Sequence, residues 1–293
     1  MTDRRRALVL LAFLTLIWGT NWPLFPLAVR EVSVWTFRAV AVPVSGLVLL
    51  AIAAARGLPL AVPRADWPRL VAATLAYLVV WNIASTYAAV YLPSGQGAVL
   101  GFTMPLWAAL ISWLLLGERL SRRLLVALGL GLAAVALLMV PSFGAYANAP
   151  AGLAAGLIAA VGWAVGTLII KHRPWQTQVL VLTGWQMILT AVPIIAGAAW
   201  LGDGRWFMPS WQSIAVIAYI TLVPMCIGNV LWFAIVGLLP ASVAGLSSIM
   251  VPVVAMVSGA IVHGEPLGPL QLAALACCVV SLRLALHKPA ASS

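Results

Sequence analysis

The sequence predicts an all-α polytopic membrane protein with ten transmembrane helices in two inverted five-helix repeats. Three observations support this fold class: the composition, the spacing of the apolar stretches, and a copy of the first half of the chain within the second. Hydrophobic residues make up 64% of the 293 residues and charged residues only 8%, and the mean hydropathy is +1.10. A soluble domain has about 25% charged residues, so this composition indicates a chain that lies mostly in lipid.

Apolar stretches of membrane-spanning length follow one another along the whole chain. A bilayer core about 30 Å thick needs about 20 apolar residues for each helical span. Ten such stretches lie between charged or Pro/Gly-rich breaks, and their approximate limits are 7–27, 33–55, 68–90, 95–116, 123–140, 151–170, 178–200, 211–235, 242–262 and 268–286. The connections between them are short and leave no room for a soluble catalytic or nucleotide-binding domain.

An internal repeat becomes visible when the chain is aligned with itself at an offset of 147 residues. The matched positions are Leu92-Pro93 with Leu239-Pro240, Pro105 with Pro252, Gly117-Glu118 with Gly264-Glu265, Leu120 with Leu267, and Asn82 with Asn229. Trp18 and Trp163 match at an offset of 145. We therefore expect an N-terminal repeat at residues 1–145 and a C-terminal repeat at 146–293. A duplicated membrane chain of this kind points to a transporter, with its substrate site between the repeats.

The distribution of Lys and Arg predicts the orientation in the membrane. With the N-terminus inside the cell, every Lys and Arg except Arg30, Arg38 and Arg205 falls in or beside a cytoplasmic segment. This is the positive-inside pattern, so we expect both termini in the cytoplasm and the protein in the cell's inner membrane. The formal net charge of +10 is then mostly a topology signal that faces anionic lipid, and no nucleic-acid partner is expected.

The duplicated Gly-Glu motif checks the inversion independently. Gly117-Glu118 is followed by Arg119, Arg122 and Arg123, whereas Gly264-Glu265 is followed by Pro and Leu without a cation. The charge difference places the two copies of this loop on opposite sides of the membrane. Five spans in each repeat, an odd number, require the same inversion.

These residues resemble a known family. Trp18-Gly19-Thr20-Asn21, Phe37-Arg38, and the two copies of a proline followed by Gly-Glu are similar to the paired EamA repeats of the drug/metabolite transporter superfamily. Within it, the chain is most similar to bacterial amino-acid exporters of the YddG type, and the resemblance covers nearly the whole chain. It implies ten helices around a central cavity and export of aromatic or neutral amino acids by alternating access. Export of other neutral metabolites or drugs is the alternative.

Two matched prolines predict interruptions within the fourth and ninth spans. Pro105 follows Gly101 by four residues, and Pro252 follows Ser248 by four. A helical proline lacks an N–H group, so the carbonyls of Gly101 and Ser248 lose their usual partners. Gly101 and the two prolines are candidate flexing points for alternating access, and contact of the freed carbonyls with a substrate ammonium is a further possibility. The competing interpretation is that each kink only shapes helix packing.

Polar and aromatic side chains within the spans are candidates for substrate binding, because they are costly when they face lipid. The candidates share a position inside a predicted span, and they are Trp18, Tyr77, Trp81, Asn82, Trp163, Gln186, Asn229 and Ser248. Aromatic walls would hold an apolar side chain, and the amides and hydroxyl would hold the charged ends of a zwitterion. For the aromatic residues the alternative is packing, and for Asn82 and Asn229 it is a bridge between helices.

Arg38 lies about five residues into the second span, at a position that the family resemblance assigns to an arginine. A structural anchor is the favoured interpretation, ahead of a clamp for a substrate carboxylate.

Ionisable chemistry is almost absent from the predicted spans. All six acidic residues and all three histidines lie near span ends, which disfavours carboxylate-based proton coupling and organic-cation binding. No phosphate-binding loop or metal-ligand spacing occurs, so no cofactor and no metal are expected. A membrane-embedded enzyme is a weaker alternative, because no catalytic set is visible. A structural membrane protein is the third possibility.

Overall fold

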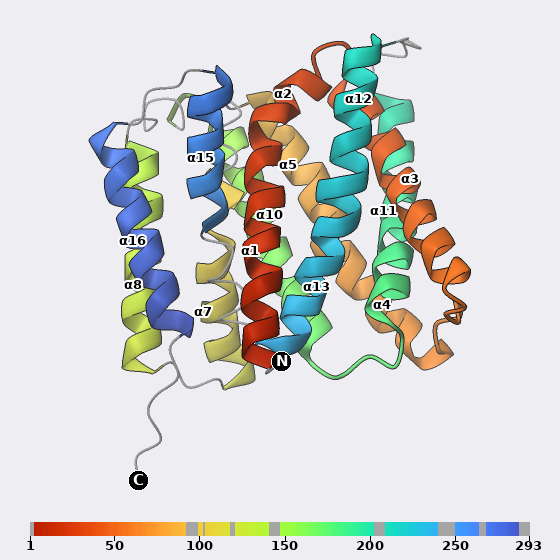
Figure 1. Cartoon of the computed structure of the whole chain (residues 1–293), viewed down its shortest axis with the longest axis horizontal. Coiled ribbons are helices and arrows are strands. Elements are labelled where there is room, and N and C mark those ends of the chain that lie inside the picture. Colours follow the sequence, from red (N-terminus) through yellow and green to blue (C-terminus); the bar gives the residue numbers. More distant parts are fainter. Residues whose placement is uncertain are drawn as a thin grey trace.

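The computed structural model is all-helical throughout the residues it describes, which are 3–91, 99–101, 103–117, 121–140, 147–201, 209–239, 250–263 and 268–286 (Figure 1). In the first half the elements are α1 (Asp3–Asn21), η1 (Trp22–Leu24), α2 (Phe25–Ala28), α3 (Val34–Ala55), η2 (Arg64–Asp66), α4 (Trp67–Thr74), η3 (Leu75–Val79), α5 (Val80–Tyr91), α7 (Met104–Leu116) and α8 (Arg122–Met139). In the second half they are α10 (Pro150–Lys171), α11 (Val179–Leu201), α12 (Trp211–Ile220), η5 (Thr221–Ile227), α13 (Gly228–Leu238), α15 (Met250–His263) and α16 (Pro269–Leu286).

Five helices in the described ranges are long and apolar enough to cross a membrane by length and composition. They are Val34–Ala55, Arg64–Ser85, Pro150–Lys171, Val179–Leu201 and Trp211–Leu238. Serines begin three of the helices, because the side chains of Ser33, Ser121 and Ser210 accept hydrogen bonds from backbone N–H groups in the first turns of α3, α8 and α12. The predicted stretches and the helices thus coincide over most of the described chain.

The fourth predicted stretch differs from the observed helix. Thr103 forms a turn, with its backbone N–H bonded to the carbonyl of Leu100, and α7 begins only at Met104. Pro105 therefore lies in the first turn of α7. In a first turn the missing N–H group of proline costs no helical hydrogen bond. Our expectation of Pro105 near the middle of a continuous span was wrong for this reason. Pro252 lies in α15, and the residues before Met250 are outside the described chain.

Two composite helices carry a wide turn at matched positions. η3, between α4 and α5, and η5, between α12 and α13, are π-helical, with backbone bonds from Val80 to the Leu75 carbonyl and from Gly228 to the Val223 carbonyl. Adding the repeat offset of 147 to the limits of η3 gives 222–226, which lies within η5. We refer to η3 and η5 as the paired π-turns. Such turns are rare and often lie at functional sites.

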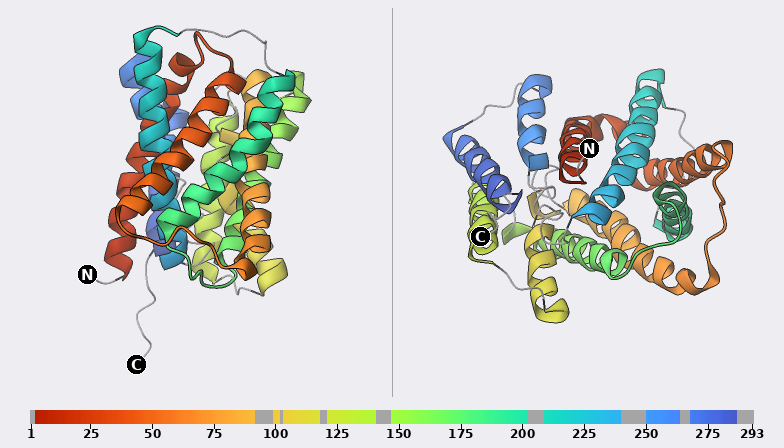
Figure 2. Two further views of the ribbon diagram at one scale, coloured as in Figure 1. Left: turned by 90° about the vertical axis from the view of Figure 1, so that its right-hand side faces the viewer. Right: turned by 60° about the horizontal axis from the view of Figure 1, so that its bottom comes forward.

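The helix contacts follow the internal repeat. α3 packs on α11 and α8 packs on α16, so the second and fifth helices of each half contact their own counterparts. α5 packs on α10 as α13 packs on α1, and α7 packs on α10 as α15 packs on α1. Figures 1 and 2 show α8 beside α16 at one edge of the bundle and α3 beside α11 at the other. Exchanging the halves therefore leaves the packing pattern unchanged.

The two halves run in opposite directions. α1 begins at the end of the bundle that carries both chain termini, whereas its counterpart α10 finishes at that end, in the connection to α11 (Figure 1). Likewise α7 ends and α8 begins at the terminus-bearing end, while α15 ends and α16 begins at the opposite end (Figure 1). Glu118 and Glu265 themselves lie outside the described residues.

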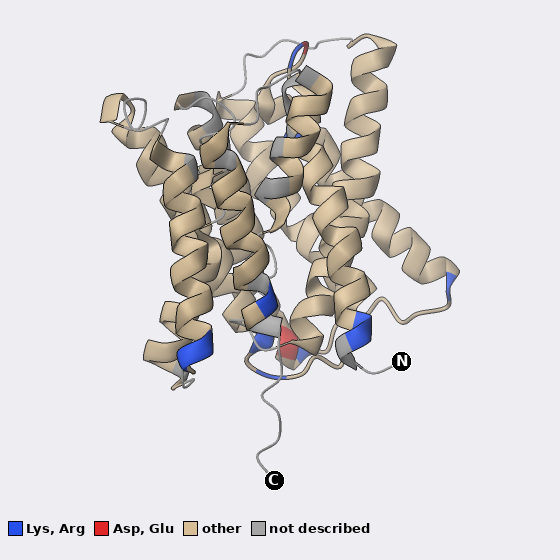
Figure 3. Ribbon diagram, turned by 60° about the vertical axis from the view of Figure 1, so that its left-hand side comes forward, with Lys and Arg blue, Asp and Glu red and all other residues tan. Residues whose placement is uncertain are grey.

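Charge and apolar surface are separated along the bundle. Lys and Arg gather at the end that carries the termini, and the long sides of the bundle are almost free of charge in the described chain (Figure 3). Large apolar side chains instead lie exposed on those sides, with Leu115 78% and Ile261 80% accessible. Isolated in water such a surface would associate, and in a bilayer it faces lipid. The chain is a multi-pass membrane protein.

Two basic residues at that end also hold helices together. Arg69 of α4 donates from Nε to the Ile169 carbonyl (3.2 Å) and from Nη2 to the carbonyls of Ile170 (2.9 Å) and Arg173, at the end of α10. Lys171 of α10 donates from Nζ to the carbonyl of Val236 (2.9 Å) near the end of α13. Cations placed on the last carbonyls of a helix satisfy acceptors that have no helical partner.

Candidate functional site

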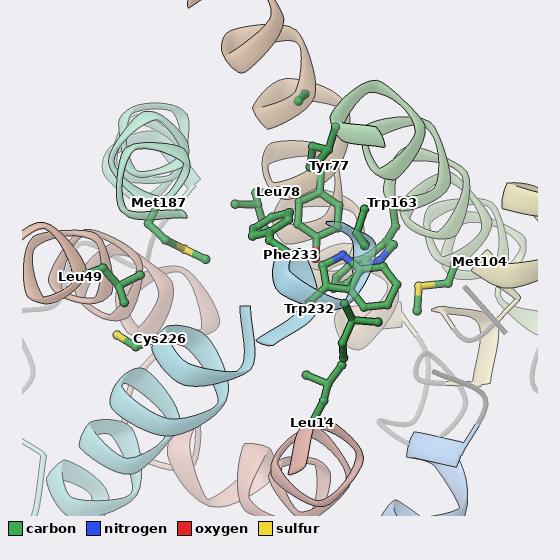
Figure 4. Close-up of a cluster of buried hydrophobic side chains, with 14 of the residues drawn as sticks. Leu14, Leu49, Tyr77, Leu78, Met104, Trp163, Met187, Cys226, Trp232 and Phe233 are labelled. Carbon is green, nitrogen blue, oxygen red and sulfur yellow. The ribbon is translucent and has the colours of Figure 1, made fainter. Parts of the chain in front are cut away.

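Six aromatic side chains from five elements meet inside the bundle. We call this set the aromatic cluster, and its members are Trp18 of α1, Tyr77 of η3, Trp81 of α5, Trp163 of α10, and Trp232 and Phe233 of α13. Figure 4 labels Tyr77, Trp163, Trp232 and Phe233. Tyr77 and Trp232 are fully buried, Phe233 is 3% exposed and Trp163 is 6% exposed. Both halves of the chain contribute, so the cluster lies at the contact between the repeats.

Trp163 is the centre of the cluster. Its ring centroid lies 4.2 Å from that of Tyr77, 4.6 Å from Trp81, 5.4 Å from Trp18 and 5.8 Å from Trp232. All four contacts are edge-to-face, the arrangement that brings the positive edge of one ring to the negative face of another. The prediction that Trp18, Tyr77, Trp81 and Trp163 lie together is therefore met in space, while their contact with substrate stays a prediction.

Close backbone approach brings these rings together. A Cβ atom at Gly166 of α10 would overlap the side chain and backbone of Tyr77, so the glycine lets α10 lie directly against η3. A Cβ atom at Gly101 would lie 2.7 Å from Cη2 of Trp81. Gly101 therefore admits the indole of Trp81, a packing role in addition to the flexing role that the sequence suggests.

The polar atoms of the cluster divide into two groups. Nε1 of Trp18 donates to the carbonyl of Pro224 within η5, at 3.1 Å. In contrast, the hydroxyl of Tyr77 and the Nε1 atoms of Trp163 and Trp232 are buried and have no hydrogen-bond partner among the described residues. Buried donors in folded proteins are almost always paired, so three unpaired donors in one cluster require an explanation.

Asn82 acts as a bridge between helices. Its Nδ2 donates to the carbonyl of Leu78 in η3, at 2.7 Å, and its Oδ1 accepts from Nη1 of Arg38 on α3. Nη2 of Arg38 also donates to the hydroxyl of Ser85, at 3.3 Å. Arg38 is thus tied to two side chains of α5, which agrees with the structural-anchor interpretation and makes bridging the observed role of Asn82.

Asn229 makes the same backbone hydrogen bond as Asn82 but has no equivalent of the bond to Arg38 among the described residues. Its Nδ2 donates to the carbonyl of Met225 in η5, at 2.8 Å. Leu78 and Met225 are themselves equivalent at the offset of 147, so each paired π-turn has one carbonyl satisfied by the asparagine that follows it. Oδ1 of Asn229 is buried without a partner among the described residues. It is a free acceptor on the helix that carries Trp232.

The remaining candidates are not among the aromatic side chains of the cluster, and one of them lies outside the described chain. Gln186 on α11 is fully buried, and neither of its amide atoms has a partner in the described part of the protein. Ser248 lies outside the described residues. Pro105 lies in the first turn of α7, and Pro252 lies in α15.

Sequence reasoning noted Trp232 beside Asn229 in the eighth span but did not include it among the candidate residues, and it did not mention Phe233. Their equivalents at the repeat offset are Ser85 and Thr86, so the self-alignment shows no aromatic match. The available signal was spacing, because Trp232 follows Asn229 by three residues and therefore shares its helix face. The paired π-turns were also missed.

The cluster offers hydrogen bonds and aromatic surface but no titratable acid or base near neutral pH. Within the described ranges, no group of three or more His, Cys, Asp or Glu side chains lies close enough to hold a metal ion. The site is thus suited to bind a neutral or zwitterionic molecule.

Fold and site together define a polytopic helical membrane protein with a buried aromatic site between two related halves. The model of the EamA-like transporter family matches residues 5–140 and again residues 150–286. The chain belongs to this family and is a secondary transporter. The family consists of transporters and not of enzymes.

Individual relatives agree with this assignment. The uncharacterized transporter YvbV of Bacillus subtilis is 27% identical over 281 residues, which are 96% of this chain and 92% of that protein. A probable amino-acid metabolite efflux pump of Salmonella typhimurium is 29% identical over 181 residues, covering 59% of this chain and 58% of the pump. A solved crystal structure with 23% sequence identity has a TM-score of 0.79 and covers 96% of this chain and 97% of its own, which shows the shared fold.

Proposed function

We propose that the protein exports aromatic and neutral amino acids by alternating access, with the substrate bound at the aromatic cluster. The observation that carries this proposal is a buried group of rings from both halves whose polar atoms are partly unpaired. Rings suit an apolar side chain, and unpaired polar atoms suit the ends of a zwitterion. The similarity to an amino-acid metabolite efflux pump supports the same substrate class.

The proposed architecture is two inverted repeats, residues 1–145 and 146–293, with both termini in the cytoplasm of a cell whose inner membrane holds the protein. The opposite directions of α1 and α10 support the inversion (Figure 1). The gathering of Lys and Arg at the terminus-bearing end supports the orientation, because basic segments remain on the cytoplasmic side (Figure 3). In such a carrier one half rocks against the other around the bound substrate.

Counterflow in proteoliposomes tests the transport activity. Vesicles loaded with one unlabelled neutral amino acid should accumulate the same labelled amino acid transiently and saturably. Empty vesicles and vesicles with an unrelated membrane protein provide the background. If a panel of neutral and aromatic amino acids shows no counterflow, while a known carrier reconstituted in parallel does, the amino-acid assignment is wrong. Counterflow of another neutral metabolite or drug would then identify the alternative substrate class.

Accessibility of single cysteines tests the architecture. The three native cysteines, Cys226, Cys277 and Cys278, are free and can first be replaced by alanine. Gly117→Cys and Gly268→Cys, which flank the two copies of the Gly-Glu loop, should react with an impermeant maleimide from opposite sides of the membrane. Labelling of both from one side would contradict inverted repeats.

A further inference from the structure

The three unpaired donors of the aromatic cluster come from separate elements and face one another. They are the hydroxyl of Tyr77 on η3 and the indole N–H groups of Trp163 on α10 and Trp232 on α13, and we call them the donor triad. Figure 4 shows the three side chains together, with their polar atoms near one another in this view, and the ring contacts of Trp163 with both other residues place them in one group. Each side chain is more than nine-tenths buried.

Four other indole N–H groups of this protein are hydrogen-bonded, in contrast to those of the donor triad. Trp18, Trp107, Trp175 and Trp185 all donate their N–H groups to acceptors within the chain, at 2.9–3.2 Å. The pairing of Trp175 and Trp185 with main-chain carbonyls shows that the bundle can supply acceptors to indoles. None of the three donors of the triad has an acceptor within hydrogen-bond distance among the described residues, although the three side chains lie in one cluster. An acceptor from outside the chain would complete this arrangement.

The geometry points to a carboxylate as that acceptor: we propose that the donor triad receives the carboxylate of the transported amino acid. This inference rests on the proposed function and assigns one end of the substrate to named atoms. A carboxylate is acceptor-only, with room for several hydrogen bonds on its two oxygens, and it bonds strongly to N–H and O–H donors. The surrounding ring faces carry negative charge density, and they suit the ammonium group of the same substrate.

The triad also accounts for how a carrier with hardly any charge at its site can distinguish substrates. A site that contains buried donors rejects a ligand without an acceptor, because its own polar groups then remain unpaired. An amine that lacks the carboxylate should therefore bind poorly even when its side chain fits. An acid that lacks the ammonium group should retain the contacts with the triad.

Competition binding on the purified full-length protein tests this assignment. Tritiated L-phenylalanine is the probe, and 3-phenylpropionate (no ammonium) and phenethylamine (no carboxylate) are the competitors. For the unaltered protein, 3-phenylpropionate should compete and phenethylamine should compete at least about tenfold less well. Equal competition by the amine would contradict a carboxylate site.

Tyr77→Phe is the decisive variant, because it removes one hydroxyl and keeps the ring. It should weaken binding of L-phenylalanine and of 3-phenylpropionate by about tenfold and leave phenethylamine unchanged. Trp163→Phe and Trp232→Phe should act in the same direction. Trp185→Phe is the control, since this indole donates to the Leu60 carbonyl and packs on Trp67 outside the cluster.

Thermal stability without ligand separates this role from a structural one. Removing an unpaired buried donor relieves a desolvation penalty, so Tyr77→Phe should have an unchanged or raised melting temperature. A lowered melting temperature with unchanged ligand affinity would show that the hydroxyl serves the fold, and the assignment would be wrong. If the unaltered protein binds 3-phenylpropionate but not L-phenylalanine, the triad stands and the amino-acid proposal fails. Binding of neither overturns both.

Discussion

At the scale of single residues, close approach between backbone and indole fixes the position of Trp18. A Cβ atom at Gly228, the first residue of α13, would overlap Nε1 of Trp18, which donates to the Pro224 carbonyl. The equivalent position in the first repeat is Trp81, whose ring packs on Trp163. The matched tryptophans of the two halves therefore have different surroundings. The indole N–H of Trp18 is hydrogen-bonded, whereas the ring of Trp163 is in contact with four other aromatic rings.

Gly228→Ala should displace the Trp18 indole and break its hydrogen bond. We expect a loss of about 1–3 kcal/mol in stability, the usual cost of overpacking, measured as a lower melting temperature in detergent. Gly129→Ala is the matched control, because a Cβ atom there meets nothing within 4 Å and alanine favours the helix. Equal melting temperatures for Gly228→Ala and the unaltered protein would show that Trp18 is not held in this way.

A second prediction concerns Glu31, in the connection between α2 and α3. Its carboxylate accepts from the backbone N–H of Ser210 (2.7 Å) and from the Ser210 hydroxyl (3.1 Å), joining this connection to the start of α12. The Ser210 backbone bond is the largest cause that lowers the pKa of Glu31, followed by hydrogen bonds from the Ser213 and Ser210 side chains. These bonds favour the ionised form.

The stability contribution of Glu31 should therefore be present at neutral pH. A carboxyl whose pKa is lower in the folded state stabilises the fold above its unfolded pKa and ceases to do so as pH falls through the folded value. Glu31→Gln should melt below the unaltered protein at pH 7, and the difference should decline and disappear as pH falls from the ordinary glutamate range through the lower folded-state pKa of Glu31. A difference that grows toward acid pH would have the wrong sign.

At the scale of elements, the paired π-turns are the feature that distinguishes α4–α5 and α12–α13 from ordinary spans. A π-turn disturbs the regular pairing of carbonyls with N–H groups along the helix. Within the membrane such a carbonyl needs another donor, since water is absent. Asn82 and Asn229 supply that donor, because each amide bonds to the carbonyl four residues before it.

Asn229→Ala should consequently destabilise η5. Loss of the bond to the Met225 carbonyl should cost about 1–3 kcal/mol, seen as a lower melting temperature. Asn229→Ser should restore much of it, because a serine hydroxyl can bond to the carbonyl four residues earlier, as the hydroxyl of Thr221 does to Ile217. If alanine and serine melt alike, the asparagine does not support the π-turn.

At the scale of the whole molecule, function should depend on the aromatic cluster more than folding does. Trp163→Ala and Tyr77→Ala remove the centre of the proposed site, so transport in the counterflow assay should fall further than the yield of folded protein. Trp200→Ala is the control, because Trp200 is 87% exposed on the surface of α11. Parallel loss of transport and yield would indicate a packing role only.

The sequence was sufficient for the features that repeat. Helix limits followed from hydropathy, and the aromatic residues within the spans, including the matched pair Trp18 and Trp163, led to the aromatic cluster. Phe233 escaped, because its equivalent at the repeat offset is Thr86 and a phenylalanine in an apolar span carries no polar atom that marks it. The expectation for Pro105 was wrong for a physical reason: a proline suits the first turn of a helix as well as its interior, and only the backbone distinguishes the two.

In the two helices that carry the paired π-turns, the number of residues should be more strictly limited than the residue type at most positions. An α-helix advances by about 100° for each residue, so deleting one residue between η3 and Trp81 would rotate everything beyond it by that angle. Trp81 and Asn82 would then face a different neighbour, although no side chain had been altered. Outside the aromatic cluster and Gly228, homologous chains should therefore vary freely in apolar residue type along these two helices, and insertions and deletions should be confined to the connections between helices.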